Sequence, residues 1–336
     1  MSQDLEPITP AEAVNLYINH REPELSDKSL QNHRYRLNSF VDWCQETGVE
    51  NLNDLSGRDL HRFRTARRDE GIAKVTLRGQ LATLRVFLEF CASIDAVESG
   101  MRERVLLPEV GADEESKDEK LDEERATELL DYLNRFAYAS REHVIVAILW
   151  HTGIRLGSLR AFDRGDFDAD EQCLDLAHRP ETDTPLKNGT AAGRSIAVGE
   201  EFCQVIQDYI DTHRHDVTDK YGRHPLITSS QGRLSSTAIR RAIYKTTRPC
   251  LHSECPHNRE RENCEAMLHD QASQCPSSRS PHGLRRGSIT SHLRDGTPEE
   301  IVTDRMNVSG DVLDQHYDRR TEREKMQLRR QFISDA

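Results

Sequence analysis

The chain has 336 residues, of which 35% are hydrophobic and 31% charged, a length and balance typical of a globular protein with two ordinary domains. No run of about 18 apolar residues occurs, and acidic residues interrupt the first stretch, so we expect neither a membrane span nor a secretory leader but a cytoplasmic location. The net charge of −12 argues, taken alone, against binding to nucleic acid.

The types of charged residue give a second indication, which concerns the environment of the protein. Acidic residues outnumber basic ones by 58 to 46, and most of the basic residues are arginine. This composition, with a mean hydropathy of −0.75, is similar to that of proteins from salt-accumulating archaea, although an acidic protein of an ordinary organism would share it. We therefore expect a halophilic protein.

Residues 1–105 carry the periodicity of helices. Thr9-Pro10-Ala11-Glu12 has the form of a capping box with proline at the first helical position. Apolar residues then recur at helical spacing in two stripes, which are Leu30, Leu37, Phe40, Val41 and Cys44, and Leu77, Leu81, Leu84, Leu88 and Cys91. Gly48 ends the first stripe, and residues 56–59 begin another helix between the two. The pattern predicts a small all-helical domain.

Residues 106–121 interrupt this pattern. Pro108 and Gly111 precede a mostly acidic run that cannot pack, which predicts a linker. Helical patterns return over residues 122–150, and three short segments then alternate apolar and polar residues like strands, at 166–168, 173–177 and 195–198. Helices follow from Glu201. The sequence predicts a second domain over residues 122–336 that is mainly α with a small antiparallel β-sheet.

Four short segments of this second domain carry side chains suited to chemistry on phosphate. Residues 151–159 contain Arg155, residues 186–189 contain Lys187, residues 281–286 contain His282 and Arg285, and residues 312–318 contain Tyr317. Each segment alone has an ordinary explanation, such as a surface ion pair for an arginine, solvation for a lysine in a turn or packing for a tyrosine.

Taken in this order, the segments resemble the tyrosine recombinase (phage integrase) family. That family places an arginine in a Thr-Gly-x-Arg turn, a lysine in a β-hairpin, a His-x-x-Arg helix and a tyrosine near the C-terminus. Its members also carry a helical DNA-grasping domain before the catalytic one, so the resemblance covers the whole chain. It implies an N-terminal helical core-binding (SAM-like) domain followed by a tyrosine recombinase catalytic domain.

The resemblance also implies a role for each residue. Tyr317 would attack the scissile phosphate and form a covalent 3′-phosphotyrosine. Arg155 and Arg285 would hold the non-bridging oxygens, because guanidinium groups match the geometry of phosphate. Lys187 would protonate the departing 5′ oxygen, and His282 would help to move the tyrosine proton. No cofactor is expected for this chemistry.

Two positions depart from the family pattern. The family usually has His or Trp nine residues before the tyrosine, where this chain has Val308, and often an acidic residue three after the first arginine, where it has Ser158. Two alternatives therefore stay open, which are a catalytically inactive DNA-binding relative and an enzyme with type IB topoisomerase-like activity.

The expected partner is double-stranded DNA, bound by a homotetramer on two paired sites, with accessory DNA-bending or directionality proteins. Integration of a mobile element is the expected task. Local clusters of basic residues predict the phosphate contacts, although solvated helix faces would explain them as well: Arg62, Arg64, Arg67, Arg68, Lys74, Thr76, Arg78, Arg240, Arg241 and Lys245.

A polar insertion at about residues 250–279 has no counterpart in the family pattern. Four cysteines fall within it, separated by 4, 8 and 10 residues, which departs from the paired CxxC spacing of common zinc sites. Too few apolar residues surround them for all four to be core residues. We expect a structural zinc, with unligated surface thiols as the alternative, and the predicted ligands are Cys250, Cys255, Cys264 and Cys275.

Overall fold

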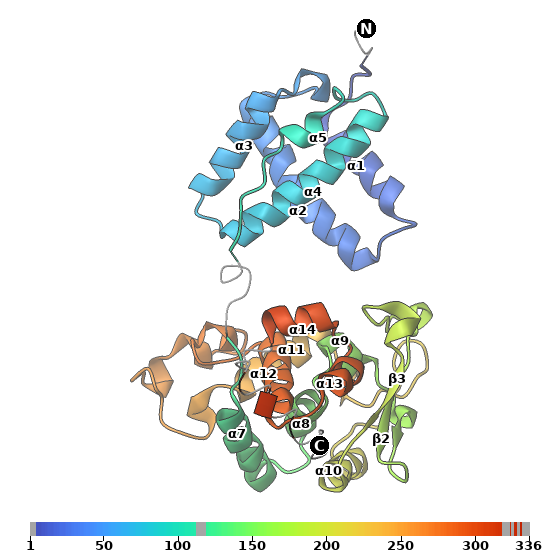
Figure 1. The fold of residues 1–336 in the computed structure, drawn as a ribbon, viewed down its shortest axis with the longest axis vertical. Coiled ribbons are helices and arrows are strands. Elements are labelled where there is room, and N and C mark those ends of the chain that lie inside the picture. The colour runs from blue at the N-terminus through green and yellow to red at the C-terminus, as the bar shows by residue number, and fades with distance from the viewer. Residues whose placement is uncertain (1–4, 112–118, 318–322, 324–325, 328–329, 331–336) are drawn as a thin grey trace. The chain divides into compact units, whose positions relative to one another are not determined.

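The computed structural model describes residues 5–111, 119–317, 323, 326–327 and 330. The chain forms two compact units, Met1–Asp118 and Glu119–Ala336, shown in Figure 1. Both are mainly helical, and the second contains small antiparallel sheets, as predicted. No helix among the described residues is long and apolar enough to cross a membrane.

The described part of the first unit contains five α-helices, and its predicted helix starts are confirmed. They are α1 (Pro10–Arg21), α2 (Asp27–Thr47), α3 (Gly57–Asp69), α4 (Lys74–Ser93) and the short α5 (Met101–Arg104). Thr9 and Glu12 form the capping box of α1, and Ser56 caps α3. Gly48 ends α2 in the left-handed conformation, with φ 76°, which glycine adopts at little cost.

The core of the first unit is rich in aromatic rings. Tyr17 of α1 meets Phe87 of α4 edge-on at 5.6 Å between ring centroids, and Phe40 of α2 meets Phe63 of α3 at 5.3 Å. Such edge-to-face pairs are favourable because the positive ring edge faces a negative ring face. All four side chains are buried, so the helices surround one continuous core.

The second unit is built around α8 (Arg141–Thr152), in which every residue from His143 to Trp150 is buried. The other helices are α7 (Glu123–Phe136), α9 (Leu156–Ala161), α10 (Glu200–Thr212), α11 (Ser236–Thr246), α12 (Pro281–Arg294), α13 (Glu299–Met306) and α14 (Gly310–His316). Helices α7, α9, α10, α11 and α12 all pack against α8. The helical pattern over residues 122–150 is divided in two at Ala139, whose φ of 50° cannot continue a helix.

A three-stranded antiparallel sheet carries the segment that contains Lys187. Its strands are β1 (Phe167–Asp168), β2 (Cys173–Leu176) and β3 (Arg194–Ala197), in the order β1-β2-β3. Leu174 pairs with Ile196 and both are buried, so one face covers the core. A second hairpin, β4 (Thr228–Ser229) with β5 (Gly232–Arg233), was not predicted, since two-residue strands show no alternation.

An ion-pair network fixes the base of this region. The carboxylate of Asp163 lies 2.6 Å from the guanidinium of Arg223 and 2.5 Å from that of Arg233. The guanidinium of Arg233 also lies 2.9 Å from the carboxylate of Asp219. These side chains are largely buried, so their attraction is screened little by solvent. Removing Asp163 would leave Arg223 largely buried with only hydroxyl and carbonyl acceptors, and a buried charge without its counter-ion is costly.

Asp163→Asn should therefore destabilise the second unit by about 3 kcal/mol, measured as a lower midpoint of urea unfolding. Asp216→Asn is the matched control, because Asp216 is 89% exposed in its pair with Arg214 and exposed pairs contribute roughly 0–1 kcal/mol. Equal losses in the two variants would contradict a structural role for the network.

The segment that enters the second unit lies against two glycines of α12. The N–H of Leu121 donates to the carbonyl of Gly283 (3.1 Å), and Arg279 donates to the carbonyl of Lys120 (3.0 Å). A Cβ at Gly287 would stand 1.9 Å from the Leu121 carbonyl oxygen, so only glycine permits this approach. Residues 119–121 are thereby fixed to the helix that carries His282 and Arg285.

Candidate active site

The first predicted arginine is placed by the turn that ends α8. Gly153 caps the helix with φ 60°, and a Cβ there would lie 2.6 Å from the Met306 sulfur, so glycine is required for both backbone and space. Arg155 follows as the N-terminal cap residue of α9. Its Nη1 donates to the carbonyl of Asn307 at 3.0 Å, and burial lowers its pKa.

The second arginine comes from α12 and is nearly inaccessible. Arg285 is 3% exposed. Its Nη1 donates to the carbonyls of Gly153 (2.6 Å) and Met306 (2.8 Å), and its Nη2 to that of Asn307 (3.4 Å). Burial lowers the pKa of Arg285 to about 10, with a contribution from the charge of Arg155, so it remains a cation at neutral pH.

The two arginines therefore meet at one turn, the C-terminal cap of α13. Asn307 occupies the left-handed region there, with φ 49° and ψ 62°, and its carbonyl accepts from both guanidinium groups. The hydrogen bonds described for the two arginines reach only uncharged groups. One buried and one half-buried cation with neutral partners suit an anion of phosphate size.

The predicted nucleophile lies beside this arginine pair. Tyr317 ends α14, with its N–H donating to the carbonyl of Leu313 at 2.9 Å. Its side chain is 6% exposed, within a small core formed by α12, α13 and α14. The charge of its hydroxyl acts to raise the pKa of Arg285 and of Arg155, against the larger effect of burial. The Arg286 guanidinium lies 6.0 Å from the ring centroid, within range of a cation–π contact.

Lys187 and His282 lie at the border of the same site. His282 is exposed in the first turn of α12. Loss of solvation lowers its pKa, and so do the charges of Arg286, Arg285, Arg155 and Lys187. Lys187 is exposed in the connection between β2 and β3, and its neighbour Asn188 donates to the side chain of Asn307 at 3.0 Å. The structure thus gathers all five predicted catalytic residues around one turn.

Both departures from the family pattern lie close to these residues. Val308 is 7% exposed and belongs to the apolar cluster that holds Tyr317, so this position contributes packing. Ser158 lies in the first turn of α9, where its N–H donates to the carbonyl of Arg155 at 2.9 Å.

The predicted DNA-contact residues remain predictions, and the structure shows their surroundings. Three arginines of α3 bind acidic neighbours, in the pairs Arg62–Asp59, Arg67–Glu70 and Arg68–Asp69. On α11, Arg241 binds Asp270 at 2.6 Å, whereas Arg240 and Lys245 are exposed. Part of each basic cluster is thus already neutralised by carboxylates.

The structure gives no support to the predicted zinc site. Over the described ranges, no three or more His, Cys, Asp or Glu side chains gather so that they could hold a metal. Among the four predicted ligands, Cys275 is buried, and the other three, Cys250, Cys255 and Cys264, are half-buried free thiols. Hydrogen bonds from the backbone N–H groups of Arg259 and His257 lower the pKa of Cys255.

Arginine side chains contact the cysteine-rich segment. Arg248 is 6% exposed and donates to the carbonyl of Ala266 and to the sulfur of Met267. Arg125 of α7 reaches the carbonyl of Ser277 at 2.8 Å. Because long cationic side chains satisfy the carbonyls of this polar segment, it acquires a fixed path with little apolar core.

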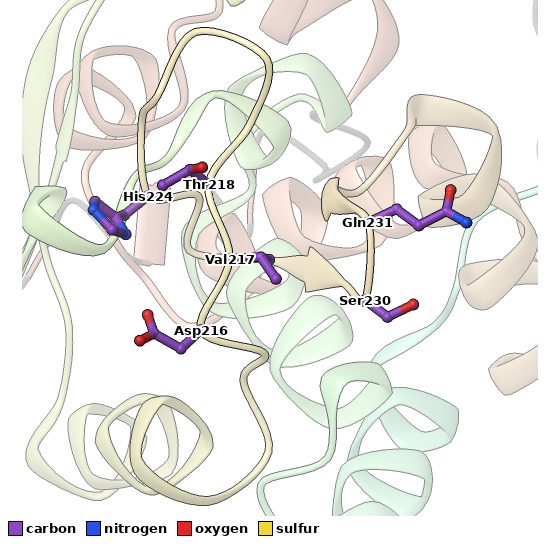
Figure 2. A pocket seen from close by; sticks show the side chains of 6 residues that line it. All are labelled: Asp216, Val217, Thr218, His224, Ser230 and Gln231. Atoms are coloured by element: carbon purple, nitrogen blue, oxygen red, sulfur yellow. The ribbon is translucent and has the colours of Figure 1, made fainter.

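A shallow hollow of about 430 Å³ lies on the loops that follow α10. Figure 2 shows one wall on the loop after α10 and the other at the turn of the β4–β5 hairpin. Its lining contains none of the predicted site residues and consists of Asp216, Val217, Thr218, His224, Ser230 and Gln231.

Comparison with known proteins shows similarity to phage integrases and tyrosine recombinases. A family model described as phage integrase, N-terminal SAM-like domain, matches residues 16–93, from within α1 to the end of α4. Tyrosine recombinase XerC of Salmonella typhi is 23% identical over 149 residues, which cover 44% of this chain and 49% of that protein. XerC of Pseudomonas syringae pv. syringae is 23% identical over 178 residues, 53% of this chain and 58% of that protein. The chain thus spans about half the length of the curated relatives it matches.

Several solved structures match nearly the whole chain, among them two integrases. A lambda integrase dimer bound to a COC′ core site has a TM-score of 0.67 at 12% identity, covering 94% of this chain and 79% of that chain. The Tn1549 transposon integrase in complex with a circular intermediate DNA has a TM-score of 0.69 at 14% identity, covering 97% of this chain and 100% of that chain. At such identities the likeness concerns the fold. The SAM-like match is confined to the first unit, and the XerC relatives are similar over about half of this chain.

Proposed function

We propose that this chain is a site-specific DNA recombinase or integrase that cuts and rejoins duplex DNA through a 3′-phosphotyrosine intermediate. One observation carries the proposal, which is that Arg155 and Arg285 share the carbonyl of Asn307, and Tyr317 lies near enough to influence the pKa of both arginines. A phosphate held by the two guanidinium groups would lie next to the phenol oxygen.

The reaction would proceed by exchange of one ester for another. The Tyr317 oxygen would bond to phosphorus as the bond from phosphorus to the 5′ oxygen breaks, which conserves the phosphodiester for rejoining. Arg155 and Arg285 would stabilise the charge of the pentavalent phosphate, since fixed donors aimed at developing charge lower the barrier. Lys187 would give a proton to the 5′ oxygen, and His282 would receive the proton of the phenol.

The proposed partner is double-stranded DNA, by analogy with the lambda and Tn1549 integrase structures that contain DNA. We further propose a homotetramer on two paired sites, assisted by DNA-bending or directionality proteins, that serves a mobile element. A halophilic origin remains a hypothesis from composition, with a net charge of −12.

Covalent trapping tests the proposal directly. The full chain is incubated with nicked duplexes of random sequence. Cleavage near the nick releases the short strand end that is needed for rejoining, so the covalent adduct accumulates. Adducts are separated on denaturing gels. Peptide mapping should place the nucleotide on Tyr317. Binding without any adduct would instead identify an inactive relative, and relaxation of supercoiled plasmid without strand exchange would favour type IB topoisomerase-like activity.

The pKa of His282 predicts a pH dependence. Because that pKa lies below its ordinary value of 6.5, the ring stays neutral and able to accept a proton at pH 6.5. The rate of adduct formation should therefore fall only as the pH drops below 6.5. His282→Gln should be slower and lose this acid limb, whereas His292→Gln, a control on the same helix, should keep it. An unchanged limb in His282→Gln would assign the titration to another group.

A further inference from the structure

The turn at Asn307 joins three separate parts of the candidate site. Its carbonyl accepts from Arg155 (3.0 Å) and from Arg285 (3.4 Å). Its side-chain oxygen accepts from Nδ2 of Asn188 at 3.0 Å. One residue thus contacts the turn before α9, the helix α12 and the connection between β2 and β3.

Asn188 matters because it directly follows Lys187. On the other side of the lysine, Leu186 is 4% exposed, and its N–H donates to Nδ1 of His178 at 2.9 Å. The backbone of Lys187 is therefore held from both sides, by the core through Leu186 and by the arginine turn through Asn188. The lysine side chain itself is exposed, so its own packing does not fix it.

We propose that Asn188 and Asn307 form a positioning pair that holds Lys187 beside the two arginines, so that its ammonium group meets the departing 5′ oxygen. This inference rests on the proposed function. As the Tyr317 oxygen bonds to phosphorus and the 5′ oxygen departs, a proton passes from Lys187 to that oxygen. Misplacement of a catalytic group by about 1 Å can cost about 10²-fold in rate.

The pair can be removed without disturbing the arginines. Glycine and asparagine are the residues that favour the left-handed cap conformation of Asn307. Asn307→Gly therefore keeps the backbone and the carbonyl that binds Arg155 and Arg285, and deletes only the side chain that meets Asn188. Because the contact is exposed, its loss should leave the midpoint of thermal unfolding nearly unchanged.

The test uses the full chain and a nicked duplex recovered from a random library by covalent trapping with the parent protein. Asn307→Gly and Asn188→Ala should each form the adduct about 10²-fold more slowly, and the double variant no more slowly than either, since both remove one interaction. Asn258→Gly is the matched control. Asn258 is an exposed, left-handed asparagine with φ 51° in the cysteine-rich segment, and its replacement should not change the rate.

A second substrate carries sulfur in place of the 5′ bridging oxygen. A thiolate leaves without a proton, because thiols ionise near pH 8.5, roughly as cysteine does. On this duplex the rate of adduct formation should return to within a few-fold of the parent rate in three variants, which are Asn307→Gly, Asn188→Ala and Lys187→Ala. Tyr317→Phe should stay inactive, because sulfur replaces the need for an acid and not for a nucleophile.

Each result tests either the positioning pair or the proposed function. Parent rates of the two asparagine variants on the oxygen substrate would overturn the inference, and so would a loss that persists on the sulfur substrate. A parent rate for Lys187→Ala on oxygen would also overturn it, since nothing would then need positioning. If the parent protein forms no adduct with any duplex, the proposed function itself fails, which is a separate outcome.

Discussion

Tyr317→Phe should abolish covalent protein–DNA adducts while leaving DNA binding and the fold nearly intact. The ring lies in the apolar cluster of α12, α13 and α14, and phenylalanine fills the same space. Arg285 keeps its bonds to the carbonyls of Gly153, Met306 and Asn307, so the arginine pair should remain in place. Only the nucleophilic oxygen is lost. Denaturing gels measure the adduct, and native gels measure binding.

Tyr138→Phe is the control for this change. Its hydroxyl also meets a side chain, donating to Asp208 at 2.6 Å, but it lies outside the candidate site. The control should form adducts at the parent rate. Adducts that persist in Tyr317→Phe would show that another residue attacks the DNA.

Arg285→Lys should slow adduct formation by about 10²–10³-fold, the typical cost of losing a preorganised donor to the transition state. The guanidinium of Arg285 donates to three carbonyls, those of Gly153, Met306 and Asn307. Lysine offers three donors from a single atom and cannot hold these groups and two phosphate oxygens together. Single-turnover rates at saturating DNA measure the loss.

Arg155→Lys should have an effect of similar size, because its Nη1 is anchored on the same carbonyl of Asn307. Arg294→Lys, an exposed position on the same helix as Arg285, should remain within a few-fold of the parent. If both site variants cleave as fast as this control, the phosphate is held elsewhere. Unfolding midpoints separate a catalytic loss from a folding defect.

Capping residues and apolar periodicity predicted the helices well and the small strands less completely. The capping box at Thr9 and the glycine cap at Gly48 mark real helix ends, because both satisfy backbone groups within a few residues. The break at Ala139 was not predicted, since apolar residues continue at helical spacing on both sides. There the packing of α7 and α8 against each other decides the path.

The candidate site could be predicted only as far as side-chain identity reveals it. Arg155, Lys187, His282, Arg285 and Tyr317 were named from a family resemblance, and the structure gathers them. Asn307 was missed because it acts through its carbonyl and its left-handed backbone. An asparagine directly after a helical run is nonetheless a known cap signal and could have located the turn.

The cysteine-rich segment shows that some ordering contacts cannot be recognised from side-chain identity. The zinc site predicted from four thiols stays a prediction, and the contacts that Arg248 and Arg125 make with this segment were not predicted. Arginines that bind backbone carbonyls leave no spacing pattern, because any residue can provide the acceptor. This organisation depends on tertiary contacts and could not be derived from composition.

The close approach of Leu121 to Gly287 also bears on how the second unit can be isolated. A fragment that starts at Asp122 would lack the backbone that fills the glycine face of α12, and the buried Leu121 side chain would be missing from the core. Water would then contact the glycine face of α12, the helix that carries His282 and Arg285. An expression boundary placed before Glu119 retains these residues, so the unit to clone begins within the acidic run and not after it.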